Sequence, residues 1–221
     1  MPETTVVARS PIAPAPPEVV VAGWAVSGRR SAAALRLSDW SPMAKVLLKA
    51  TPTGGAAQGL GVPFGRAASQ SWTLDDRQLS VLVVGAGPGE WLALSAPGTQ
   101  DGVLAHLDAA VASRSNELVT VIALTHGRAL IRLTGSRSAD VLAKETSVDL
   151  SDSVRPDGSA LRTAVAGLAT DIVRDDRAGE RSYLVHCERS SGQYLFESLL
   201  DAGSEFGIEI DGFVPPEAEE T

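Results

Sequence analysis

The sequence predicts an α+β protein built from two successive split βαβ units of the ferredoxin-like type. Short apolar and β-branched runs alternate with three helical segments, in the order β-β-α-β followed by β-α-β-β-α. Turn residues separate these runs at short intervals. The chain has 221 residues, a length that predicts one or two domains with a buried core.

The first unit is expected between residues 72 and 124. Apolar runs separated by turn residues predict strands at residues 72–74, 79–84 and 91–95. A helix is expected over 98–112, where apolar residues recur at helical spacing: Val103, Leu104, Leu107, Ala110 and Val111. The β-branched run at 118–124 predicts the strand that closes the unit.

The second unit follows directly and is expected to end near residue 203. Its segments are predicted as strands at 129–133, 161–173 and 182–187, and as helices at 136–145 and 191–203. Ser136 or Ser138 is the expected N-cap of the first helix. The inward face of the last helix is expected to carry Tyr194, Leu195, Ser198 and Leu199.

The two ends of the chain differ in composition from the region between them. Residues 1–30 form a Pro-rich arm, expected to be extended and partly disordered because proline lacks a backbone donor. Residues 31–213 form the α+β domain, within which 50–58 is expected to be a loop. Residues 214–221 form an acidic tail, expected to be disordered.

Charge and composition exclude several classes of protein. The net charge is −8 and basic residues are scattered singly, so the footprint of a nucleic-acid-binding protein is missing. The apolar run Val19–Val26 is too short to span a membrane, and Glu3 and Glu18 argue against a secretory signal. A single cysteine, Cys187, fits a reducing cytoplasm.

The most suggestive motif is the glycine cluster Gly85-Ala-Gly-Pro-Gly89, which follows an apolar run. In a dinucleotide-binding fold such glycines open a helix whose N–H groups receive the pyrophosphate. Here Glu90 would put negative charge at that position, and Pro97 ends the next segment before a crossover helix could form. We therefore expect a hairpin turn rather than a nucleotide loop.

A second group of polar residues joins two expected strands at Thr125-His126-Gly127-Arg128. It has the residue types of a site, but the sequence shows no set of nucleophile, base and orienting group, which favours a polar corner. Arg132 lies on the strand face opposite Ile131, which favours a solvated or interface residue.

The remaining reactive side chains have structural interpretations as well. Cys187 follows His186 in an apolar strand, where neighbours point to opposite faces, so a structural cysteine is expected. The acidic residues Asp175, Asp176 and Glu180 are interleaved with arginines, as at a charged hairpin tip, and Ser190-Ser191-Gly192 is interpreted as a helix cap. The sequence assigns no catalytic, cofactor-binding or metal-ligating residue.

Several longer segments, in order and spacing, resemble the gamma subunit of heterotetrameric sarcosine oxidase. The resemblance covers roughly Leu35 to Phe213. It is carried chiefly by LGVPFGR at residues 60–66, VVGAGPGEWL at 83–92, LTHGRALIRLTG at 124–135, RTAVAG at 162–167 and DAGSEFG at 201–207. Through this family the fold is related to the folate-binding T-protein of glycine cleavage, an aminomethyltransferase.

The resemblance implies a noncatalytic subunit of an enzyme that demethylates sarcosine to glycine. That enzyme forms hydrogen peroxide and either formaldehyde or methylene-tetrahydrofolate. FAD, FMN, NAD and tetrahydrofolate would belong to the partner subunits, and the chain would pack chiefly on alpha within an assembly of alpha, beta and delta subunits. A stand-alone folate-binding or one-carbon transfer protein, or a subunit of a related N-methyl amine oxidase, remains an alternative.

Overall fold

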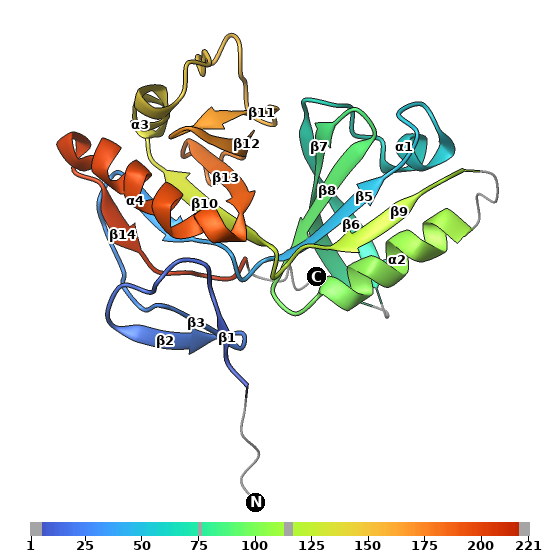
Figure 1. Cartoon of the computed structure of the whole chain (residues 1–221), viewed down its shortest axis with the longest axis horizontal. Coiled ribbons are helices and arrows are strands. Elements are labelled where there is room, and N and C mark those ends of the chain that lie inside the picture. Colours follow the sequence, from blue (N-terminus) through green and yellow to red (C-terminus); the bar gives the residue numbers. More distant parts are fainter. Residues whose placement is uncertain (1–5, 75–76, 113–116, 217–221) are drawn as a thin grey trace, which may run out of the picture.

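The computed structural model describes residues 6–74, 77–112 and 117–216, and these form three β-sheets and four α-helices (Figure 1). The six-stranded sheet has the strand order β11-β12-β13-β10-β4-β14. Its strands are β4 (Arg36–Asp39), β10 (Arg128–Thr134), β11 (Ala160–Val165), β12 (Leu168–Arg174), β13 (Ser182–Glu188) and β14 (Glu209–Asp211).

The five-stranded sheet has the order β6-β7-β8-β5-β9. Its strands are β5 (Ala44–Lys49), β6 (Ala67–Leu74), β7 (Arg77–Gly87), β8 (Glu90–Ser95) and β9 (Thr120–Ala123). The N-terminal sheet consists of β1 (Ala8–Arg9), β2 (Glu18–Val21) and β3 (Trp24–Ser27). The helices are α1 (Gly55–Leu60), α2 (Gln100–Ala112), α3 (Ser138–Glu145) and α4 (Gly192–Ala202).

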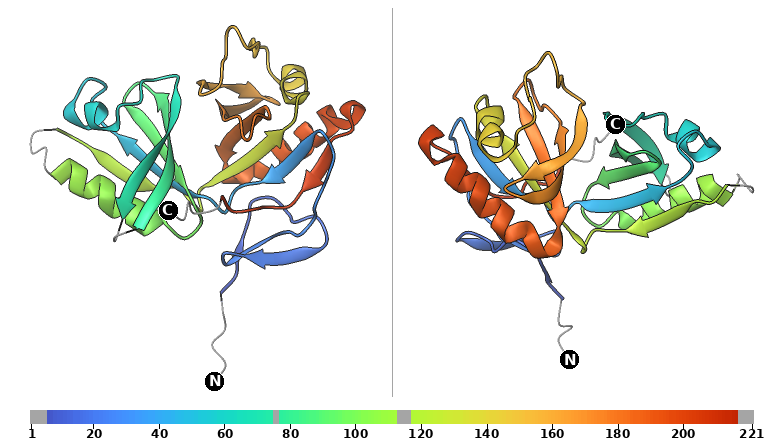
Figure 2. Two further views of the ribbon diagram at one scale, coloured as in Figure 1. Left: turned by 180° about the vertical axis from the view of Figure 1, so that it is seen from behind. Right: turned by 45° about the horizontal axis from the view of Figure 1, so that its top comes forward.

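Helices cover one face of each large sheet, and the other faces of the two sheets turn toward each other (Figure 2). Leucines and valines of the six-stranded sheet pack against α3 and α4, and those of the five-stranded sheet pack against α1 and α2. A third cluster joins the sheets, with Leu82, Val84, Leu92 and Leu94 on one side and Leu130, Val173 and Leu184 on the other. Successive side chains of a strand point to opposite faces of the sheet, so each strand can pack against helices with one face and against the other sheet with the other.

The predicted α+β class is confirmed, and the expected segments between residues 72 and 203 all form. The segment 161–173 is a hairpin of two strands rather than one, because Ala166 and Gly167 adopt positive φ angles and turn the chain. The helix expected over 98–112 forms as α2. Val103 and Leu107 are buried and Leu104 is partly buried, whereas Ala110 is exposed and the side chain of Val111 lies outside the described residues.

Three local predictions were wrong. The expected loop at 50–58 overlaps α1, which begins at Gly55, because Ala56 and Leu60 are buried and Glu117 Oε2 accepts the N–H of Ala56 at 3.0 Å. Neither α3 nor α4 has a side-chain cap, because backbone carbonyls of the preceding turns accept their first N–H groups. Tyr194 is exposed, and Phe196 takes its place on the inward face of α4.

Part of the N-terminal arm forms a small sheet, which its prolines did not predict. β1 pairs in parallel with β3, and β2 pairs antiparallel with β3. Ile12 is buried in the core beneath α4, and Trp24 and Val26 are buried in the cluster between the large sheets. Burial of these apolar side chains provides the stabilisation that the sequence pattern does not reveal. Residues 1–5 and 217–221 lie outside the described residues.

None of the helices in the described part of the chain combines the length and the apolar character needed to cross a bilayer.

Candidate functional site

The glycine cluster closes the hairpin between β7 and β8, as the sequence predicts. Pro88 and Gly89 form the turn, and the strand register shifts between Gly85 and Gly87. Gly89 has a φ of 75°, and a Cβ there would meet the carbonyl oxygen of Ala50 at 2.4 Å. Glycine is therefore required at this turn by backbone conformation and by close approach of another strand end.

The polar side chains gather in the cleft between the two large sheets rather than at the hairpin. Two cavities lie there, toward opposite ends of β8, β10 and β13, with the apolar cluster of Leu92, Leu94, Leu130 and Leu184 near their boundary. We call them the arginine cavity, which is lined by Arg132 and Arg177, and the histidine cavity, which is lined by His186 and Asp171.

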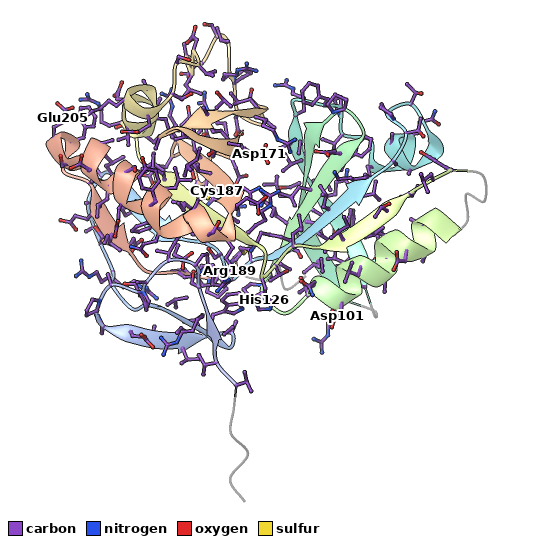
Figure 3. All side chains as sticks on the ribbon, viewed as in Figure 1. Asp101, His126, Asp171, Cys187, Arg189 and Glu205 are labelled. Atoms are coloured by element: carbon purple, nitrogen blue, oxygen red, sulfur yellow. The ribbon has the colours of Figure 1, made fainter. Side chains whose placement is uncertain are left out.

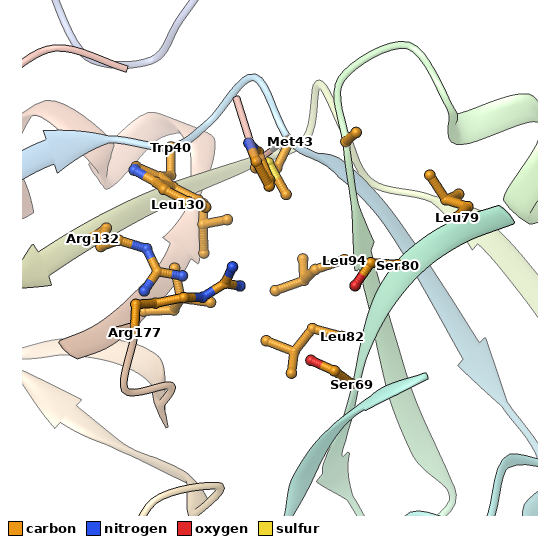
Figure 4. Close-up of a pocket in the computed structure, with 13 residues that line it drawn as sticks. Trp40, Met43, Ser69, Leu79, Ser80, Leu82, Leu94, Leu130, Arg132 and Arg177 are labelled. Carbon is orange, nitrogen blue, oxygen red and sulfur yellow. The ribbon is translucent and has the colours of Figure 1, made fainter. Parts of the chain in front are cut away.

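The arginine cavity is built around a buried guanidinium (Figure 4). Arg132 donates from Nη2 to Asp175 Oδ2 at 2.6 Å and from Nη1 to Ser182 Oγ at 2.6 Å, and it lies 4.0 Å above the ring of Trp40. The cavity has a volume of about 40 Å³, enough for a few waters at most. Of the two positions expected for Arg132, solvated or at an interface, the solvated one is therefore wrong. Asp175, Ser182 and Trp40 contact the guanidinium, whereas its Nε is buried without a hydrogen-bond partner among the described residues.

The histidine cavity is larger, at about 320 Å³. A chain of ionisable groups crosses it from the five-stranded to the six-stranded sheet. Lys49 Nζ bonds Glu90 Oε1 at 2.8 Å, and Glu90 Oε2 accepts from Arg162 at 3.1 Å. Arg162 Nε donates to Asp171 Oδ1 at 2.6 Å, and Asp171 Oδ2 lies 3.4 Å from His186 Nδ1. Figure 3 shows Asp171 between the two sheets.

Cross-strand register explains why these residues meet. Arg162 pairs with Asp171, Asp171 with His186, and Lys49 with Glu90. Directly paired residues share a sheet face. The sequence did not single out Arg162 or Asp171. The pair Ala166-Gly167 could have predicted their contact, because a turn there makes a hairpin in which Arg162 lies opposite Asp171.

The electrostatics of this chain are set by burial and pairing. The hydrogen bond from Lys49 is the main cause that lowers the pKa of Glu90. Burial opposes ionisation of Asp171, but hydrogen bonds from His186 and Arg162 outweigh it and lower the pKa of that carboxyl. Burial lowers the pKa of His186, so the imidazole is neutral at physiological pH. In the sequence, the negative charge of Glu90 argued against a phosphate site. In the structure, its carboxylate pairs with Lys49 and Arg162 as one member of the ion-pair chain.

The polar corner at residues 125–128 lies at the base of the cleft, where Figure 3 shows His126 and Arg189 near the junction of the sheets. Thr125 Oγ1 accepts a backbone N–H of β5 at 3.0 Å. The His126 ring stacks on Trp24 with centroids 4.8 Å apart, and its carbonyl accepts from Arg189 at 3.2 Å. Thr125 thus has the backbone contact expected of a polar corner, whereas the His126 ring stacks on Trp24 and the Arg128 side chain pairs with Glu188.

A buried lysine that the sequence did not reveal lies beside this corner. Lys45 is fully buried in β5, and its Nζ donates to the carbonyls of Ser41 at 2.6 Å and Met43 at 2.8 Å. Burial lowers the pKa of Lys45 to about 7, and the charge of Asp39 opposes that shift. Strand alternation places Lys45 on the same face of β5 as Leu47 and Lys49, which line the histidine cavity.

Cys187 is buried on the opposite strand face from His186, as predicted, among the residues that pack under α3 and α4. Burial raises the pKa of its thiol to about 11. The three histidines have separate surroundings: His106 stacks on Trp72, His126 on Trp24, and His186 adjoins Asp171.

The charged turn after β12 is more than a solvated tip. Arg174 is buried, and it bonds Asp176 at 2.9 Å, Asp152 at 2.5 Å and the carbonyl of Arg155 at 2.8 Å. Arg36 bonds Glu180 at 2.5 Å. The bonds of Arg174 attach the loop before β11 to the turn after β12, and the bond of Arg36 attaches that turn to β4, so these residues have a structural role.

The fold and the cleft define a class of protein: an α+β chain with two helix-backed sheets that face each other across a polar cleft. Residues 79–214 match the model of the GCVT N-terminal domain, and the chain belongs to this family. No curated protein matches the chain.

The fold recurs in solved structures, among them the following two. A chain of the heterotetrameric sarcosine oxidase from Corynebacterium sp. U-96, solved with pyrrole 2-carboxylate, is 22% identical and has a TM-score of 0.62 over 80% of this chain and 88% of that chain. The glycine cleavage system aminomethyltransferase T from Bartonella henselae is 16% identical, with a TM-score of 0.66 over 88% of this chain and 55% of that chain. The structural similarity confirms the aminomethyltransferase-like fold expected from the sequence motifs.

Proposed function

We propose that this chain is the noncatalytic gamma subunit of a heterotetrameric sarcosine oxidase. The enzyme would convert sarcosine to glycine, with hydrogen peroxide and either formaldehyde or methylene-tetrahydrofolate as the other products. FAD, FMN, NAD and tetrahydrofolate would be held by the partner subunits, and this chain would contact chiefly the alpha subunit. A cytoplasmic location fits the single buried cysteine.

The observation that carries the proposal is the extent of the structural similarity. The similarity to the sarcosine oxidase chain covers 88% of that chain, whereas only 55% of the aminomethyltransferase is covered. This chain thus has the span of one subunit of the oxidase and of a part of the aminomethyltransferase. The ordered motifs between residues 60 and 207 support the same assignment.

The surface offers apolar side chains for such a partner. Large hydrophobic side chains at least half exposed include Val20, Phe64, Leu118, Tyr194 and Val214. Obligate subunit interfaces commonly bury more than about 2,000 Å² and are apolar at their centres. The exposed residues come from the N-terminal sheet, the loop beside the β7–β8 hairpin, the segment before β9, α4 and the segment after β14, so a partner that covered them would surround much of the chain.

Native mass spectrometry of the complex tests this proposal. The chain, carrying an affinity tag, is co-expressed with the larger flavin-binding chains of an oxidase of this type. We expect these chains to be retained with it in a stable complex that oxidises sarcosine. A well-behaved monomer that fails to retain them, on mixing as well as on co-expression, would contradict the proposal.

The alternative function is folate binding or one-carbon transfer by the isolated chain, which the shared aminomethyltransferase fold favours. Calorimetry with tetrahydrofolate separates the two functions. Submicromolar to micromolar binding by the chain alone supports the alternative, and absence of heat supports the subunit role. Assaying the purified complex with other N-methyl amines distinguishes sarcosine oxidase from a related oxidase.

A further inference from the structure

The histidine cavity contains one polar atom whose hydrogen-bonding capacity the chain does not use. Within the described residues, His186 Nε2 is buried without a hydrogen-bond partner, and the side chain is 5% exposed. Unpaired buried polar atoms are rare, because each forfeits its hydration without compensation. His186 lines a cavity of about 320 Å³, so the missing partner can come from a bound molecule.

The pairing of the other ring nitrogen fixes what Nε2 requires. Asp171 is ionised and can only accept hydrogen bonds, so Nδ1 of His186 carries the ring proton. Nε2 is then a lone pair that accepts a hydrogen bond. The group that reaches it must be an N–H, an O–H or an ammonium.

A guanidinium with unused donors lies on the same sheet face as this acceptor. Arg128 on β10 is paired with Glu188, and its neighbour on that face, Leu130, is paired with His186. The guanidinium makes one ion pair, from Nη1 to Glu188 Oε1 at 2.8 Å. Because a guanidinium has five donors, Arg128 retains N–H groups for a ligand carboxylate.

The rest of the lining matches a ligand with both charges and an apolar body. Lys49, Arg128 and Arg162 balance Glu90, Asp171 and Glu188, so the cavity has no net formal charge. Such a site favours a molecule without net charge. Apolar side chains from β5, β8 and the residue after β9 complete the wall: Leu47, Leu92 and Leu124. Volumes of about 300 Å³ and above are typical of small-molecule sites.

We propose that the histidine cavity binds a zwitterionic α-amino acid with an apolar side chain. Its ammonium group donates to His186 Nε2, its carboxylate pairs with Arg128, and its side chain contacts the leucine wall. The site lies within this chain and is independent of the subunit role proposed above.

Calorimetry on the full-length chain tests this assignment with L-leucine and two analogues. L-leucinamide lacks the carboxylate and 4-methylpentanoate lacks the ammonium group, while both keep the apolar body. We expect saturable binding of L-leucine and binding at least about tenfold weaker for each analogue. Equal binding of all three compounds, or no saturable heat with L-leucine up to about 10 mM, would overturn the proposal.

Variants assign the binding to the residues named. His186→Gln keeps an acceptor oxygen and is expected to retain L-leucine binding within a few fold, whereas His186→Phe is expected to lose at least about tenfold. Arg128→Gln is expected to abolish the preference for L-leucine over L-leucinamide. The matched control His106→Gln changes a histidine that stacks on Trp72 behind the other sheet face, and it should bind as the original chain. Unchanged binding by a folded His186→Phe and Arg128→Gln would place the ligand elsewhere and refute the site.

Discussion

Arg132 and Asp175 form an ion pair that is almost closed to solvent, with Nη2 and Oδ2 2.6 Å apart and the two side chains 6% and 12% exposed. The pair connects the centre of the six-stranded sheet to the charged turn after β12. Arg177 shares the same carboxylate at 2.9 Å. The position of the turn at the cleft edge therefore depends on charges that water does not screen.

Removing one partner of this pair is expected to be costly. Asp175→Ala leaves the Arg132 guanidinium buried without its counter-ion, and we expect a loss of about 3 kcal/mol in the free energy of unfolding. Urea denaturation measures it. The matched control is Asp140→Ala, which breaks the exposed pair with Arg137 and should cost less than about 1 kcal/mol. Similar losses in both variants would contradict the description of the first pair as buried and unscreened.

The two alanine variants Gly89→Ala and Gly98→Ala separate steric conflict from backbone strain. Both glycines have φ near 80°, which costs about 1 to 2 kcal/mol for a residue with a Cβ. Only at Gly89 would the added Cβ meet a carbonyl oxygen, that of Ala50, while at Gly98 nothing lies within 4 Å. We expect Gly89→Ala to lose at least about 1 kcal/mol more, measured by thermal unfolding of both variants. Equal losses would mean that the hairpin turn is not held against Ala50.

Lys45 should make the free energy of unfolding depend on pH. Its pKa is about 7 in the folded chain against an ordinary value of 10.5, so between these values the unfolded chain binds the extra proton. The free energy of unfolding then rises with pH above about 7, and below it the full penalty of burying the charge remains. We expect a rise of about 1 to 2 kcal/mol between about pH 7 and pH 8.5.

Urea denaturation of Lys45→Met between about pH 7 and pH 8.5 tests this prediction. This range lies below 9.0, the ordinary pKa of the Cys187 thiol in the unfolded chain, so ionisation of the cysteine contributes little. The slope should disappear in Lys45→Met and persist in the control Lys49→Met, because the Lys49 side chain is half exposed. A slope that survives unchanged in Lys45→Met would assign the pH dependence to another group.

Cys187 should be inert in the folded chain. Burial removes access to the thiol and raises its pKa to about 11, so the reactive thiolate is scarce at neutral pH. We expect labelling by a disulfide reagent to be at least about a hundredfold slower than in urea-unfolded chain. The chain has a single cysteine, so the absorbance of the released thiol reports this residue alone. Rapid labelling without urea would show that the core beneath α3 and α4 opens readily.

Local pattern was a good guide where a segment's own residues decide its structure. The β-branched run at 118–124 and the helical spacing in 98–112 each formed the expected element, and the glycine cluster turned the chain as expected. Such segments carry their apolar pattern and their breakers within about ten residues. The same reasoning failed for α1, which depends on Glu117, a residue roughly sixty positions away.

The sequence by itself determined the α+β class, the order of the segments from residue 72 to 203, the hairpin at Gly89 and the burial of Cys187. Tertiary structure alone decided that the N-terminal arm forms a sheet, that Lys45 and Arg132 are buried, and that Arg162, Asp171 and His186 share one cavity. The reason is physical: periodicity specifies which face of a strand is apolar, whereas the pairing register and the packing of the sheets specify which polar groups meet there and lose their water.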